Sequence, residues 1–103
     1  MSLRVVVRSS AETDLLESAM FIAEDDPAAA QRFLDEAEKA FARVAEFPEI
    51  GSPRTASDPS LAGLRLWPVP GFEKLRICYI PRVDHIDVLR VLHGARDSER
   101  FFE

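Results

Sequence analysis

A short acidic break between two amphipathic helical segments constrains the fold of this 103-residue chain most strongly. Apolar residues recur at helical spacing over 10–24 and again over 27–47. Asp26 is a suitable N-cap between them, and Pro27 suits the first helical position because its missing N–H would be unpaired there. With only about two residues between them, the helices are predicted to fold back as an antiparallel hairpin.

Strand-like segments stand on both sides of this hairpin. A period-two pattern over 3–7, with three valines, predicts a first strand. A loop rich in proline, glycine and serine follows the hairpin over 48–62. Apolar runs over 64–67, 74–80 and 86–93 then predict the remaining strands.

The expected fold class is α+β in the order βααβββ, with a helical hairpin packed on one face of a small antiparallel sheet. One domain over 1–103 suffices for a chain of this length. Pro68 and Pro70 follow the 64–67 strand and predict that it lies at an edge, since proline cannot donate to a ladder. The residues expected in or near the core are Val5, Leu15, Phe33, Phe41, Ile77, Val88 and Leu92.

Composition limits the classes of function. A net charge of −5 gains little from phosphate neutralisation, so we expect no direct sequence-specific nucleic-acid binding. No apolar run approaches the roughly 20 residues of a membrane span, and the single cysteine, Cys78, fits a reducing compartment, so we expect a cytoplasmic protein without membrane contact. Asp25 and Asp26 are interpreted as helix-capping residues, and no metal or cofactor motif is present, so we expect neither group.

Two segments carry a family resemblance. They are AEDDPAAAQRFLDEAEKAFARVAEFPEIGSPR at 23–54 and VLRVLHGARD at 88–97. Together with the order of elements, they resemble the ParE branch of the RelE/ParE superfamily, the toxins of bacterial toxin–antitoxin pairs. The resemblance runs from Val5 to about Phe102. It implies a helical hairpin on a sheet in which the predicted strands take the order first, fourth, third, second.

The resemblance also implies a function. A ParE-like toxin inhibits DNA gyrase by binding, is neutralised by a ParD-like antitoxin, and takes part in plasmid stabilisation. The alternative is a ribosome-dependent mRNA endonuclease of the RelE type, and a third possibility is a non-toxic binding module. In the RelE branch, basic side chains hold the scissile phosphate and a tyrosine or histidine completes the site. Phe101 or Phe102 stands at the tyrosine position here, and neither has a hydroxyl to transfer a proton.

Basic side chains in the second half of the chain are candidate contacts to a target or partner. Guanidinium groups bind phosphate or carboxylate groups as a fork. By the resemblance, Arg76 and Arg96 match functional arginines of the RelE branch, and Arg65 matches loosely. A structural role remains open for His93, and an ion pair with a nearby carboxylate remains open for Arg96. The complete candidate set is Arg65, Arg76, Arg90, His93 and Arg96.

The helical hairpin is the candidate antitoxin surface. An apolar groove could accept an amphipathic helix, and an exposed sheet edge could accept a strand. The residues predicted to line the groove are Leu16, Met20, Phe21 and Phe33. Tyr79 and Cys78 lie within a strand-like run and are expected to be core residues without a catalytic role.

Overall fold

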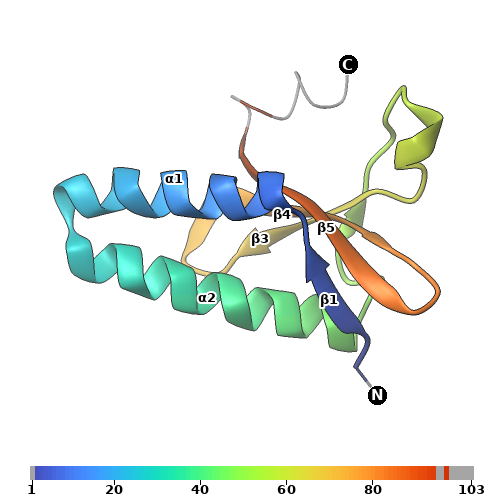
Figure 1. Cartoon of the computed structure of the whole chain (residues 1–103), viewed down its shortest axis with the longest axis horizontal. Helices are drawn as coiled ribbons and strands as arrows, with labels where there is room; N and C mark the ends of the chain where they lie inside the picture. The colour runs from blue at the N-terminus through green and yellow to red at the C-terminus, as the bar shows by residue number, and fades with distance from the viewer. Residues whose placement is uncertain (1, 95–96, 98–103) are drawn as a thin grey trace.

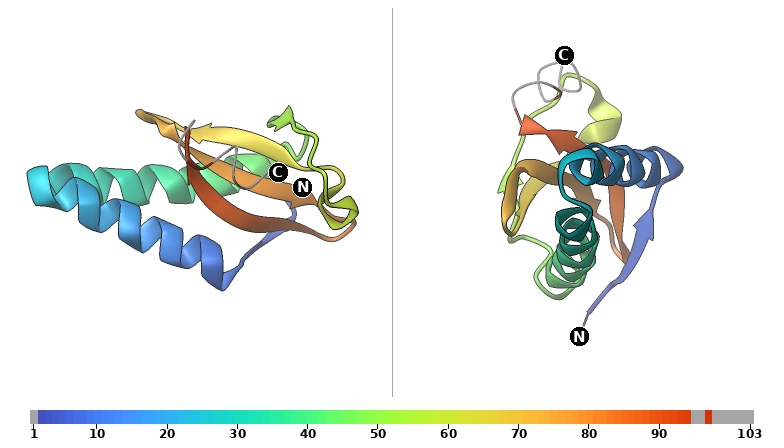
Figure 2. Two further views of the ribbon diagram at one scale, coloured as in Figure 1. Left: turned by 90° about the horizontal axis from the view of Figure 1, so that it is seen from above. Right: turned by 90° about the vertical axis from the view of Figure 1, so that its left-hand side faces the viewer.

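The computed structural model describes residues 2–94 and 97, which form a layer of two helices on a sheet (Figure 1). The elements in chain order are β1 (Arg4–Val7), α1 (Ser9–Asp25), α2 (Pro27–Glu46), β2 (Ser52–Pro53), the 3₁₀ helix η1 (Pro59–Leu61), β3 (Arg65–Val69), β4 (Phe72–Pro81) and β5 (His85–His93). Both helices lie on the same side of the sheet (Figure 2). The predicted α+β class and the helical hairpin are therefore confirmed.

The turn of the hairpin is made as the sequence predicts. The Asp26 carboxylate accepts hydrogen bonds from the backbone N–H groups of Ala28 at 3.1 Å and Ala29 at 3.2 Å. Pro27 occupies the first turn of α2. This satisfies donors that would otherwise be unpaired at the helix start. The acidic residue at this position is therefore a cap.

The sheet has five strands in the order β1-β5-β4-β3-β2. The order predicted for the four longer strands is confirmed. The expectation of a purely antiparallel sheet is wrong, because β1 pairs with β5 in parallel, with Val5 opposite Ile86 and Val7 opposite Val88. No tight turn joins these two strands, so nothing local imposes an antiparallel direction on them.

Strand β3 differs from its predicted bounds. It continues through Pro68 to Val69, with a register shift between these two residues. The short strand β2 pairs with its beginning, with Ser52 opposite Leu66 and Pro53 opposite Arg65. β2 therefore covers only the first part of β3, and the predicted edge position applies to the part that contains Pro68. No described strand lies on the outer side of that part, so the missing N–H of proline costs no hydrogen bond to a neighbouring strand there.

Apolar residues are buried on both faces of the sheet. On the helix side, Phe33, Ile77 and Val88 are buried, and Val5, Leu15 and Phe41 pack partly buried against them. On the other face, Ala56 and Leu61 of the 48–62 loop pack against a second cluster. That cluster consists of Leu64, Leu66, Cys78, Ile80, Leu89 and Leu92. The seven predicted core residues are confirmed, but the loop unexpectedly covers the second face.

Neither α1 nor α2 is long and apolar enough to cross a membrane. The C-terminal segment 98–102, for which a turn of helix was considered, lies outside the described residues, as do Phe101, Phe102 and Arg96.

Candidate functional site

Two of the arginines predicted as contacts to a target or partner point to different faces of the sheet. Arg65 lies opposite Tyr79, whose side chain belongs to the helix-side core. Arg76 is exposed and precedes Ile77, which faces the helices. Because neighbouring side chains on a strand point to opposite faces, Arg76 projects away from the helices. Arg65 and Arg76 therefore do not join in a single phosphate-binding cluster.

Arg65 holds the segment that follows α2. Its Nη1 donates to the carbonyl oxygens of Glu49 at 3.0 Å and Gly51 at 2.6 Å. The Gly51 N–H donates to the Tyr79 hydroxyl at 2.9 Å, and that hydroxyl donates to the Pro48 carbonyl at 2.8 Å. A Cβ on Gly51 would lie 2.7 Å from the Tyr79 oxygen, so glycine is required there. Burial raises the pKa of Tyr79, and its hydroxyl is committed to this structural contact.

Arg90 is held by α1. Its Nε and Nη2 donate to the Asp14 carboxylate at 2.7 and 2.9 Å, and the Val91 N–H donates to the same group at 3.0 Å. The Asp14 side chain is only 12% exposed. Hydrogen bonding to Asp14 raises the pKa of Arg90. Arg90 was predicted as a target contact, and the structure places it in an intramolecular ion pair that joins α1 to β5.

Replacing Asp14 by asparagine is expected to lower the free energy of unfolding by about 1–2 kcal/mol. The amide removes the charge of Asp14 beside Arg90 and cannot accept all three hydrogen bonds. Urea denaturation measures the change. Glu38→Gln, at an exposed position on α2, is the matched control and should change stability by less than about 0.5 kcal/mol. Equal effects for the two variants would show that the Asp14 ion pair is dispensable.

His93 lies in a cleft between α1 and the ends of β4 and β5. The cleft has a volume of about 300 Å³, and its lining includes Asp14, Glu17, Phe21, Leu75, Val91 and Asp97. The backbone N–H of His93 donates to the Asp97 carboxylate at 2.9 Å. Its ring Nδ1 is buried and finds no hydrogen-bond partner within the part of the chain that the structure describes. The histidine is therefore neither a fully satisfied core residue nor part of an open basic surface.

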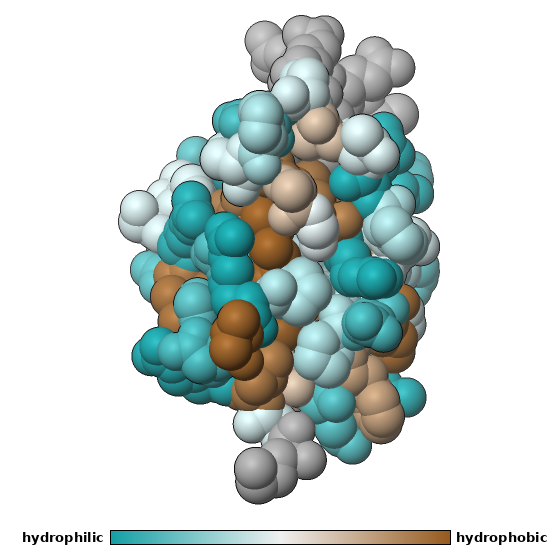
Figure 3. Space-filling view, turned by 90° about the vertical axis from the view of Figure 1, so that its right-hand side faces the viewer, coloured by the Kyte–Doolittle hydropathy of each residue, from teal (hydrophilic) through white to brown (hydrophobic). Residues whose placement is uncertain are grey.

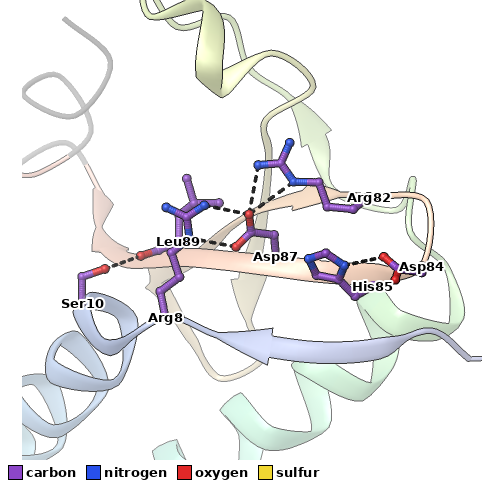
Figure 4. A network of polar contacts seen from close by, with 7 residues as sticks. All are labelled: Arg8, Ser10, Arg82, Asp84, His85, Asp87 and Leu89. Atoms are coloured by element: carbon purple, nitrogen blue, oxygen red, sulfur yellow. Dashed lines mark hydrogen bonds and ion pairs between the residues drawn. The ribbon is translucent and has the colours of Figure 1, made fainter.

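Asp87 forms a polar network that the sequence analysis did not identify as a unit (Figure 4). Both of its carboxylate oxygens accept hydrogen bonds from Arg8 at 2.9 Å, and Arg82 donates to Oδ2 at 3.0 and 3.3 Å. Burial raises the pKa of Asp87, but the hydrogen bonds from the two arginines outweigh it and the pKa lies below its ordinary value. The signal that could have identified this network in the sequence is an aspartate within an otherwise apolar strand, because a buried carboxylate needs a partner. Its partner Arg8 lies 79 residues away.

Cys78 offers no nucleophile. Its side chain is fully buried on the sheet face opposite the helices, as expected. Burial raises the pKa of the thiol to about 12, so almost no thiolate forms at neutral pH. Among residues 2–94 and 97, no group of three His, Cys, Asp or Glu side chains could hold a metal ion.

The four residues predicted to line the antitoxin groove differ in how far they are buried. Leu16, Met20 and Phe21 on α1 are 61%, 69% and 74% exposed. Phe33 is 0% exposed and packs edge-to-face on Phe72, with ring centroids 5.4 Å apart. Phe33 is therefore a core residue, and its assignment to the groove is corrected. The exposed apolar surface of the hairpin belongs to α1.

The opposite end of the molecule, which carries η1 and the β4–β5 turn, has a mixed surface. Hydrophilic side chains border a narrow band of hydrophobic ones there (Figure 3). Val83 in the turn is fully exposed, but it is a single side chain. Isolated exposed apolar residues are ordinary on protein surfaces, so the described residues at this end present no feature comparable with the three neighbouring apolar residues of α1.

Comparisons with known proteins cover nearly the whole chain. The model of the family described as "ParE toxin of type II toxin-antitoxin system, parDE" matches residues 5–98. A solved structure described as the chromosomal ParDE TA system from P. aeruginosa aligns with a TM-score of 0.68 at 14% sequence identity, covering 90% of this chain and 97% of that one. At this identity the structural likeness concerns the fold alone. No curated protein sequence matches the chain significantly.

Proposed function

We infer the function of this chain from the family to which it belongs, that of the ParE toxins of type II toxin–antitoxin systems. We propose that the toxin inhibits DNA gyrase by binding it, and that a ParD-like antitoxin neutralises the toxin. The choice of gyrase follows by analogy with the family, because fold alone does not specify a target. The proposed site of action is the cytoplasm, where gyrase works on DNA.

The basic and hydroxyl side chains are mostly engaged in hydrogen bonds within the protein, which supports inhibition by binding over RNA cleavage. Cleavage of RNA requires groups that hold the phosphate and groups that transfer protons. Within the described residues, Arg65 and Arg90 are held by intramolecular contacts, and the Tyr79 hydroxyl is bonded to backbone groups. Among the described residues, Arg76 is exposed on the sheet and is the proposed contact to the target. Arg96, which lies outside the described residues, is the second proposed contact.

The exposed apolar residues of α1 support the proposed antitoxin interaction. Leu16 and Met20 lie one turn apart on the same side of the helix, and Phe21 lies beside them. An amphipathic helix of an antitoxin recognises such a surface by burying apolar side chains at helical spacing. Free toxin would expose these residues to water, which favours a lasting complex with the antitoxin.

Purified toxin is expected to make gyrase accumulate cleaved plasmid DNA. The measurement is a supercoiling reaction stopped with detergent and protease, in which linear plasmid is scored with and without gyrase. Arg76→Ala and Arg96→Ala should reduce the linear product strongly. Arg32→Ala, at an exposed position on α2, is the matched control and should retain full inhibition.

The same preparation should leave mRNA intact in a reconstituted translation reaction. Codon-specific mRNA cleavage that is lost in His93→Ala would overturn the proposal and establish the endonuclease alternative. Full gyrase activity at toxin concentrations that stop bacterial growth would reject gyrase as the target. Growth inhibition should also be relieved when a ParD-like antitoxin is produced in the same cells.

A further inference from the structure

The cleft beside α1 combines an apolar interior with an exposed aromatic wall. Ile22, Leu75 and Val91 line its inner part, and Phe21 stands at its side with 74% of its surface exposed. A phenylalanine at the border of a cavity is within reach of whatever enters. The face of an aromatic ring attracts cations as well as apolar groups.

The charges around the cleft favour a cation. Asp14 is already balanced by Arg90. Glu17 is exposed and lies one helical turn before Phe21, and Asp97 adds a second carboxylate to the lining. On the β4 side, Glu73 and Lys74 offset each other. Arg90 also interacts electrostatically with Asp97. Taken together with Arg90, the described residues of the lining still carry an excess of negative charge beside an apolar interior.

His93 supplies an observation independent of this charge. His93 lines the cleft, and its Nδ1 is buried and has no hydrogen-bond partner in the described residues. Leaving a buried polar atom without a partner has a cost in free energy, and most such atoms in proteins are paired. An incoming N–H donor would remove this cost when the ring carries its proton on Nε2, which leaves Nδ1 as an acceptor.

We propose that the cleft receives an arginine side chain of the antitoxin. The guanidinium group pairs with Glu17, stacks on Phe21 and donates to His93 Nδ1, and the methylene groups pack in the apolar interior. Arginine fits better than lysine because its planar group stacks and donates in several directions. A second copy of this chain is a poorer occupant, because each copy carries a net charge of −5. The identity of the partner rests on the proposed function, whereas the chemistry of the cleft does not.

An NMR titration tests the cleft without the antitoxin. Nα-acetyl-arginine amide is added to ¹⁵N-labelled toxin, and Nα-acetyl-citrulline amide, which is nearly isosteric and uncharged, is the control probe. The arginine probe should shift the amide signals of Phe21, Val91 and His93 in a saturable way, and the citrulline probe should not. Equal shifts from both probes, or no saturable shift from arginine, would overturn the inference.

Variants then connect the cleft to the complex. Glu17→Gln should weaken arginine binding several-fold and weaken the antitoxin complex, and Glu38→Gln on α2 should do neither. If the antitoxin binds and neutralises both variants equally, the cleft inference is wrong and the proposed toxin function stands. If the arginine probe binds but no ParD-like antitoxin neutralises the toxin, the partner assignment fails and the cation site remains.

Discussion

Truncation of Phe33 to alanine is expected to lower the free energy of unfolding by about 3–5 kcal/mol, the usual cost of removing a buried aromatic ring. Phe33 is completely buried between α2 and the sheet, and its ring meets that of Phe72. Urea denaturation followed by the fluorescence of Trp67, the single tryptophan, measures the loss. Since a small domain has only about 5–15 kcal/mol of stability, Phe33→Leu provides a milder variant with an expected loss of about 1.5 kcal/mol.

Phe21 is the matched control on the same hairpin. Its side chain is mostly exposed, so Phe21→Ala should change stability by no more than about 0.5 kcal/mol. The same substitution should weaken antitoxin binding about tenfold, because an aromatic anchor is lost from the interface. If Phe33→Ala leaves stability unchanged, the assignment of Phe33 to the core is wrong. If Phe21→Ala binds the antitoxin as tightly as the original chain, α1 is not the antitoxin surface.

Replacing Asp87 by alanine is expected to cost about 3 kcal/mol, the lower end of the range for breaking a buried ion pair. The lower end applies because the side chains of Arg8 and Arg82 are 52% and 37% exposed and can regain water. The loss should appear first at β1, since Arg8 follows this strand and Asp87 lies opposite Val6. Hydrogen exchange should therefore show faster opening of β1 than of β4.

The contribution of Asp87 should depend on pH. Its pKa is lowered in the folded state, so the stabilisation is complete above the unfolded value of about 3.9 and is lost as the pH falls through the folded value. The difference in stability between the original chain and Asp87→Ala should therefore be constant near neutrality and shrink in acid. Asp84→Ala is the control, because Asp84 is exposed where it contacts Arg4 at 3.6 Å and His85 at 2.7 Å, and such surface pairs contribute little, so the variant should unfold nearly like the original chain. A difference that stays constant down to pH 2 would show that Asp87 is not the titrating group.

The sequence alone was sufficient to predict the helical hairpin and the succession of the four longer strands, but not the short strand β2 within the predicted loop. Local signals carry this information, because Asp26 and Pro27 cap α2 through contacts within three residues. The apolar patterns of α2 and β5 also reflect their own periodicity. The family resemblance of segments 23–54 and 88–97 added two predictions, the order of the strands in the sheet and the family. The family model matches residues 5–98 and so confirms the family.

Tertiary structure alone decided which of the predicted residues are available for contacts. Arg90 and Asp14 are 76 residues apart in the chain, so no local pattern shows that they form an ion pair. The parallel pairing of β1 with β5 and the covering of the second sheet face also depend on segments distant in sequence. α1 carries apolar residues on more than one side, so its periodicity could not tell buried positions from exposed ones. Phe33 was predicted both as a core residue and as a groove residue beside Phe21, and only the packing of the hairpin on the sheet showed that Phe33 is buried and Phe21 exposed.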